Sequence, residues 1–137
     1  MFTTRKGWSI IEVLIATIII GVLVAIFIPS YRASIEQSHC ATAMQNLRSL
    51  RQAEISFYAT NQQYTNNLAL LGPIIGADLV TLLPPVGAGE PWGYSIGLGA
   101  TTFTLTAQRN GGRWNTNTIT LNEIDQWGGT YPIDGPW

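Results

Sequence analysis

The chemistry that this sequence offers is concentrated in its first twelve residues. Arg5 and Lys6 supply two positive charges, Gly7 follows them, and an apolar run then begins at Trp8 and contains one charge, Glu12. Hydrolysis of the peptide bond after Gly7 would leave a free amine on Trp8, four residues from the Glu12 carboxylate. If neighbouring helices are staggered by one turn, these two groups can form an ion pair between subunits. Such pairing would offset the cost of a carboxylate in lipid, about 2.5–3.5 kcal/mol at the centre of a span.

The apolar run is long enough to cross a membrane. It covers twenty-one residues, Trp8–Ile28, and a helix of that length is roughly 31 Å long, close to the hydrocarbon thickness of a bilayer. We therefore predict a spanning helix over residues 8–30, with Arg5 and Lys6 holding the N-terminus in the cytoplasm. In a simpler interpretation, Glu12 only marks the membrane edge, because it lies one turn from the start of the helix.

The order of the parts differs from that of a secretory signal, whose small-residue cleavage site follows the apolar region. Here the small residue, Gly7, precedes it. Cleavage would therefore remove residues 1–7 as a charged leader and leave the apolar helix on the mature protein. This interpretation requires a dedicated peptidase on the cytoplasmic side.

Two helix-breaking residues, Gly21 and Pro29, lie in or just after the apolar run. Pro29 could end the spanning helix, or it could kink a longer one. The sequence that follows favours continuation, because residues 30–71 contain no Gly or Pro. A helical stripe of apolar residues follows, with Glu54 at its one missing step: Cys40, Ala43, Leu47, Leu50 and Phe57. We predict one long helix, kinked or locally melted between Gly21 and Pro29, which ends near residues 61–63.

The N-terminal region resembles that of type IV pilins and the related pseudopilins. The resemblance covers about residues 5–60 and is carried by Lys6, Gly7, Trp8, Glu12, Gly21 and Pro29. It implies that a prepilin peptidase cuts after Gly7 and methylates the new amine of Trp8, and that Glu12 docks the subunit into a growing filament. Trp8 departs from the family pattern, in which phenylalanine is usual. The implied partners are copies of the chain, an assembly platform and minor pilins.

The second half of the chain contains strand patterns separated by turns. Alternation over Thr101–Ala107 and Thr116–Asn122, with a turn at residues 110–112, predicts an antiparallel hairpin. Trp92–Ile96 predicts a third strand, whereas Leu68–Leu83 is typical of a loop with short helical turns. The resulting α+β class, a long helix on a three- or four-stranded antiparallel sheet over residues 31–137, is the headpiece expected of a pilin.

The charge balance argues against a general nucleic-acid partner. Without residues 1–7 the side chains carry five basic and eight acidic groups, a net of −3, and an acidic domain attracts phosphate poorly. Arg109 and Arg113 beside Trp114 could form a small stacking site, although a solvated hairpin tip is the simpler interpretation.

The C-terminal tail is rich in Gly, Pro and aromatic residues. Its acids, Glu123, Asp125 and Asp134, could surround a Ca²⁺ ion, but solvated loop acids are the simpler interpretation. We expect three aromatic residues to pack the tail onto the sheet, with contact between subunits as a second possibility: Trp127, Tyr131 and Trp137.

Catalytic and cofactor chemistry is not indicated. The single cysteine, Cys40, cannot form an intrachain disulfide, and adjacent His39 points elsewhere on a helix. We therefore expect no enzyme, no cofactor and no metal, but a structural subunit of a pilus-like filament. It would cross the bacterial inner membrane once before assembly and lie in an extracellular or periplasmic filament afterwards. The alternatives are a pseudopilin or minor pilin of a type II secretion or DNA-uptake system, and a single-pass anchor with a carbohydrate-binding head.

Overall fold

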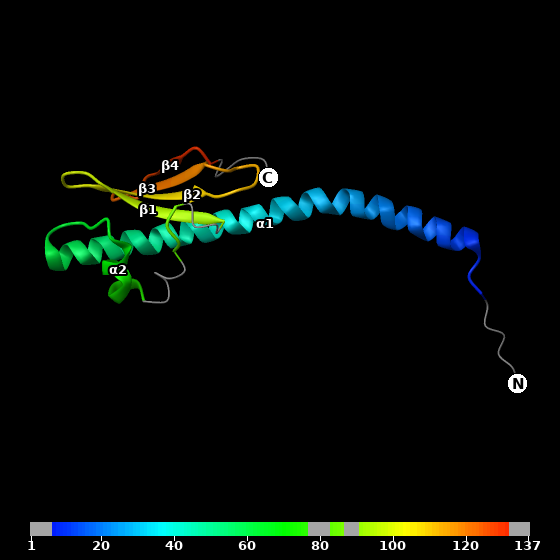
Figure 1. The fold of residues 1–137 in the computed structure, drawn as a ribbon, viewed down its shortest axis with the longest axis horizontal. Helices are drawn as coiled ribbons and strands as arrows, with labels where there is room; N and C mark the ends of the chain where they lie inside the picture. Colours follow the sequence, from blue (N-terminus) through cyan, green and yellow to red (C-terminus); the bar gives the residue numbers. More distant parts are fainter. Residues whose placement is uncertain (1–6, 77–82, 87–90, 132–137) are drawn as a thin grey trace, which may run out of the picture. The chain divides into compact units, whose positions relative to one another are not determined.

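The computed structural model describes residues 7–76, 83–86 and 91–131. The elements follow the chain in the order α1 (Ile10–Asn61), α2 (Leu68–Ile75), β1 (Trp92–Leu98), β2 (Phe103–Arg109), β3 (Thr118–Asn122) and β4 (Trp127–Gly129) (Figure 1). The predicted α+β class is confirmed. The chain divides into two compact units, one before and one after the boundary between Gln37 and Ser38.

Helix α1 is a single α-helix of 52 residues that includes Gly21 and Pro29. The prediction that the helix continues past Pro29 is therefore confirmed. No residue between Gly21 and Pro29 leaves the helix, so the predicted local melting is not observed. A kink at these two residues remains a prediction.

The second half of α1 supplies one side of the headpiece core. The predicted stripe is buried at Cys40, Ala43, Leu47 and Leu50, while Phe57 is only half-buried. Burial of this stripe is the main interaction that stabilises this part of the helix, because intrinsic helix propensity alone rarely keeps a helix folded in water.

Four antiparallel strands form the sheet, in the order β1-β2-β3-β4. The predicted hairpin is confirmed, with Ala107 opposite Ile119 in the β2–β3 register. Both hairpin strands begin two residues later than the alternation predicts, because residues 101–102 and 116–117 belong to the adjoining turns. Gly111 and Gly112 both have positive φ in the connection, as the predicted turn requires.

The remaining strands complete the sheet at its two edges. Strand β1 extends to Leu98, two residues beyond the prediction, and the tail contributes the short strand β4. One face of the sheet is buried against the core through alternating side chains: Phe103, Leu105, Ala107, Ile119 and Leu121. In Figure 1 the sheet lies along the second half of α1.

Hydrogen bonds from α1 join the helix to strand β1 and to the turn between β3 and β4. Asn46 Nδ2 donates to the Tyr94 hydroxyl at 2.9 Å, and burial raises the pKa of Tyr94 above its usual value. Arg51 donates from Nε and Nη2 to the backbone oxygen of Glu123, at 3.2 and 2.8 Å.

The segment after α1 forms more regular structure than the sequence predicted. Part of the predicted loop is helix α2, which Asn67 caps by accepting a hydrogen bond from the amide of Ala69 at 3.0 Å. Pro73 is accommodated inside this short helix. The end of the predicted loop, residues 77–82, lies outside the described residues.

Candidate functional site

The first half of α1 exposes a continuous apolar surface. The exposed fraction of its large hydrophobic side chains ranges from 47% at Val24 to 87% at Ile10, and the only half-buried residue between Ile10 and Ile28 is Ala16. By length and composition, α1 contains one segment that could cross a membrane, and none of that segment is buried in the structure. A helix that is hydrophobic on all sides needs lipid or other protein around it.

Glu12 makes a contact at the start of this helix that the sequence reasoning missed. Its Oε2 accepts a hydrogen bond from the Ser9 amide at 2.8 Å, while the amide of Glu12 donates to the backbone oxygen of Ser9 at 3.0 Å. The bond from the Ser9 amide to the Glu12 carboxylate is one of the two bonds of a capping box, for which Ser-x-x-Glu is the sequence signature. The carboxylate is also favoured there by the positive end of the helix dipole. The isolated subunit therefore already satisfies part of the hydrogen-bonding capacity of Glu12.

The proposed cleavage point lies in exposed, non-helical chain. Gly7 and Trp8 precede α1, Trp8 is 78% exposed, and a Cβ placed on Gly7 would meet no atom within 4 Å. Nothing in the described chain covers the bond between them. Arg5 and Lys6 lie outside the described residues.

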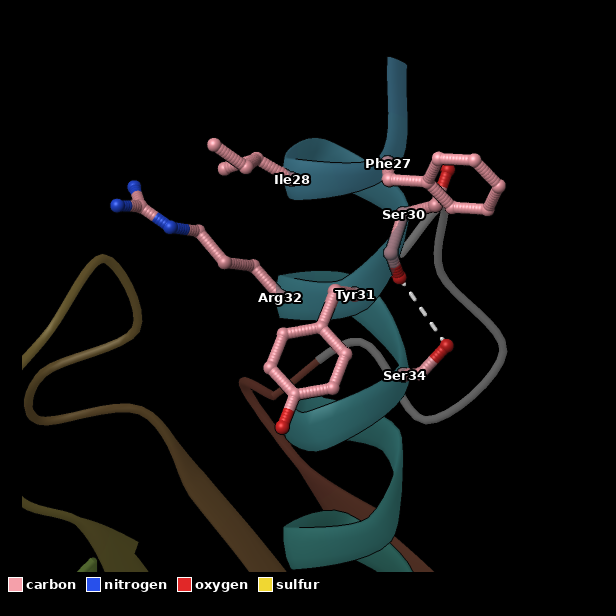
Figure 2. Close-up of a pocket in the computed structure, with 6 residues that line it drawn as sticks. All are labelled: Phe27, Ile28, Ser30, Tyr31, Arg32 and Ser34. Carbon is pink, nitrogen blue, oxygen red and sulfur yellow. Dashed lines mark hydrogen bonds between the residues drawn. The ribbon is translucent and has the colours of Figure 1, made fainter. Parts of the chain in front are cut away.

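A change from apolar to polar surface follows Ile28. Six residues of α1 border an open recess of about 440 Å³ on the side of the helix: Phe27, Ile28, Ser30, Tyr31, Arg32 and Ser34. Figure 2 shows Ile28 and Arg32 extending to the same side of the helix, and Phe27 to the other side. Ser34 Oγ donates to the backbone oxygen of Ser30 at 3.1 Å, so its hydroxyl is satisfied within the helix. Tyr31 and Arg32 are the residue types that mark the end of a membrane span.

On the headpiece, the structure brings two residues of the predicted stacking site, Arg113 and Trp114, together. The guanidinium of Arg113 lies 5.1 Å from the centre of the Trp114 ring. Arg109 instead donates from Nη1 to the backbone oxygens of Pro91 and Asn110, at 2.9 and 2.7 Å.

A second cation–π pair joins residues that are distant in the sequence. Arg48 on α1 lies 5.3 Å from the centre of the Trp127 ring on β4. No short-range pattern could have indicated this pair.

Comparison with known protein families shows which family the chain belongs to. Residues 29–120, about two thirds of the chain, match a family described as type IV minor pilin ComP, DNA uptake sequence receptor. The chain belongs to this type IV minor pilin family. The match begins at Pro29, so it does not depend on the leader and the apolar run that carry the resemblance in the sequence. No curated protein and no solved structure gave a match.

The acids of this pilin form no metal centre in the described part of the chain. No group of three or more His, Cys, Asp or Glu side chains gathers there, and Asp134 lies outside the described residues. The backbone oxygen of Glu123 accepts hydrogen bonds from Arg51, and Asp125 lies in the turn before β4 with a φ of 65°.

The aromatic residues of the tail pack on the headpiece as predicted, where they are described. Tyr131 is buried, and its ring lies edge-on to those of Trp92 and Trp114, with centroids 5.0 and 5.7 Å apart. Trp127 is half-buried at the edge of the sheet, whereas Trp137 lies outside the described residues.

Proposed function

We propose that this pilin is a structural subunit of a type IV pilus or a related filament, processed after Gly7 and polymerised through the first half of α1. The observation that carries this proposal is the apolar surface of that half, which is exposed on every side. Membrane lipid covers this surface before assembly, with the N-terminus in the cytoplasm, and neighbouring helices cover it in the filament. Repetition of one heterologous contact generates an open helical assembly.

Glu12 sets the register in this proposal by exchanging partners. In the free subunit its carboxylate accepts a hydrogen bond from the Ser9 amide of its own helix. In the filament the carboxylate instead pairs with the Trp8 amine of a neighbour, which cleavage has exposed. An ion pair away from water is stronger than the hydrogen bond that the same carboxylate accepts from an uncharged amide, so the exchange favours assembly.

A role in DNA uptake is the second candidate, favoured by the description of the matched family. On the headpiece, Arg113 over Trp114 offers a cation and a ring that could contact phosphate and base. The net charge of −3 in the mature chain instead predicts weak binding to DNA. A measurement of DNA binding can therefore separate the two expectations.

The filament proposal is tested by shearing filaments from cells and analysing them by mass spectrometry. We expect this chain in the sheared fraction, with an N-terminus at a methylated Trp8. A chain that retains residues 1–7 in the filaments, or that is found only as a membrane monomer, would contradict the proposal.

The DNA proposal is tested with the full-length pilin in detergent and duplex DNA over a range of salt concentrations. If Arg113 contacts phosphate, Arg113→Gln weakens binding and reduces the slope of log affinity against log salt by about one. Arg32→Gln is the matched control, because Arg32 is exposed and lies on α1 before the boundary between Gln37 and Ser38. Absence of binding at low salt would reject the role and support the charge-based expectation.

A further inference from the structure

A small recess on the headpiece takes no part in the functions proposed above. It has a volume of about 200 Å³ and lies where the end of α1 meets the turn that joins β1 to β2. Its walls are Tyr58, Gln62, Gln63, Tyr64 and residues 98–101. We refer to it as the Tyr58 recess.

The aromatic wall of the Tyr58 recess is fixed by the core. The ring of Tyr64 packs edge-on to buried Phe103, with centroids 4.8 Å apart, and Tyr58 stacks on Tyr64 at 4.6 Å with an interplanar angle of 29°. Tyr58 is nevertheless 39% exposed, so the stack extends from the core to solvent. Its orientation is set before any ligand arrives, which reduces the entropic cost of binding.

The chain next to this wall is also held in place. The amide of Thr65, directly after Tyr64, donates to Oε2 of the fully buried Glu54 at 3.1 Å. On the opposite wall, the amide of Gly99 donates to the backbone oxygen of Thr102 at 2.8 Å and closes the β1–β2 turn.

The polar part of the recess is neutral. Gln62 and Gln63 are exposed, and a glutamine amide has two N–H donors and one acceptor oxygen. Gln62 Nε2 donates to the backbone oxygen of Ala59 at 3.4 Å, so its second N–H and its oxygen are the groups that it offers to a ligand. No charged residue is among those that line the recess, and none of the five arginines of residues 31–137 borders it: Arg32, Arg48, Arg51, Arg109 and Arg113. A nucleic-acid strand would need cations for its phosphates. The chemistry of the recess therefore favours a ligand with hydroxyl groups and no charge.

We infer that the Tyr58 recess binds one ring of a neutral saccharide. The C–H face of a pyranose carries partial positive charge and is attracted to the negative face of an aromatic ring. The two glutamine amides can donate to, and accept from, the hydroxyls at the ring edge. The volume is below the roughly 300–1,000 Å³ of sites for drug-sized ligands, so it suits one sugar ring rather than a longer segment.

The test uses the full-length pilin in detergent micelles on an array of neutral oligosaccharides, followed by titration with the strongest binder. We expect Tyr58→Ala to weaken binding roughly tenfold, which is the loss of one aromatic stacking contact. Tyr58→Phe keeps the ring and should bind like the wild type. Tyr31→Ala removes another exposed tyrosine outside the recess and is the matched control.

Gln63→Ala supplies a second variant, because this exposed side chain can be removed without opening the core. It should weaken binding as well, with an unchanged unfolding transition. The inference is overturned if no neutral saccharide binds, if Tyr58→Ala and Gln63→Ala bind as tightly as the wild type, or if a single-stranded oligothymidylate displaces the saccharide from the recess. The pilin is unassembled in this experiment, so the result does not depend on the filament proposal.

Discussion

The two halves of α1 share one helical backbone and have opposite surroundings. From Ile10 to Ile28 the helix is apolar on all sides and exposed. From Cys40 to Ala53 only one stripe is apolar, and that stripe is fully buried in the headpiece. The stripe uses its apolar surface to stabilise the folded subunit, whereas the first half leaves its surface available for lipid or for other subunits. The proposed assembly therefore uses the surface that folding does not bury.

Two of the three glutamates of α1, Glu12 and Glu54, show the same contrast. Each accepts a hydrogen bond from a backbone amide: Glu12 from Ser9 at 2.8 Å and Glu54 from Thr65 at 3.1 Å. Glu12 is exposed and can exchange its partner. Glu54 is fully buried, and its Oε1 has no hydrogen-bond partner among the described residues. Burial raises the pKa of Glu54 above the usual 4.5, and the hydrogen bond from the Thr65 amide offsets part of this rise.

The largest expected effect comes from blocking the removal of the leader. Gly7→Leu should leave the full-length precursor in the membrane and remove the chain from sheared filaments, because the proposed peptidase requires the small residue. Folding should be unaffected, since no atom lies within 4 Å of a Cβ at this position. Mass spectrometry of the membrane pool checks the result, and a normally trimmed chain would contradict it.

Glu12→Ala should be processed normally but should be nearly absent from filaments, because the subunit loses its docking charge. Glu12→Gln is the sharper variant, since glutamine also serves in a capping box and can keep the bond to the Ser9 amide. If the charge sets the register, the two variants are equally defective. Wild-type incorporation of Glu12→Gln would assign Glu12 to capping alone.

The two halves of α1 should respond differently to the loss of an apolar side chain. Leu47→Ala creates a cavity in the core and should lower the free energy of unfolding of the headpiece by about 2–5 kcal/mol. Ile19→Ala, at an exposed position of the apolar half, should change it by less than about 0.5 kcal/mol. Urea unfolding of the full-length chain in detergent measures both. Equal losses of unfolding free energy in the two variants would contradict the difference proposed between the two halves of α1.

The smallest expected effect is a pH dependence from Glu54. Because its folded-state pKa is raised, the neutral form favours folding, and its contribution to stability is complete below pH 4.5 and is lost as the pH rises through the folded-state value. Glu54→Gln cannot titrate. The stability of the wild type relative to Glu54→Gln should therefore fall as the pH rises. If the stability of the wild type relative to Glu54→Gln instead increased with pH, the raised pKa of Glu54 would be contradicted.

Local patterns predicted most of the fold. The long helix followed from its apolar stripe, and the β2–β3 hairpin followed from alternation around a glycine turn. Strand β4 was not predicted, because Trp127–Gly129 is three residues long, ends in two glycines and shows no alternation. It is defined by antiparallel pairing with β3, in which Leu121 lies opposite Trp127.

The site could be predicted only where its contacts are local. The Ser9–Glu12 cap spans three residues, and its Ser-x-x-Glu signature was available in the sequence. The Arg48–Trp127 pair and the Tyr64–Phe103 contact join distant segments, so they could not be found without the fold. The buried state of Glu54 was indicated by its place in the stripe, but its bond to Thr65 was not.

The central claim is that the apolar half of α1 packs against other pilin subunits after assembly. A photo-reactive benzophenone residue in place of Ile20, which is exposed in the free subunit, tests this claim in intact filaments. After irradiation and mass spectrometry, we predict a cross-link to the N-terminal helix of another pilin subunit, on a chain that begins at Trp8. Cross-links to lipid alone, in cells that carry filaments, would contradict the account.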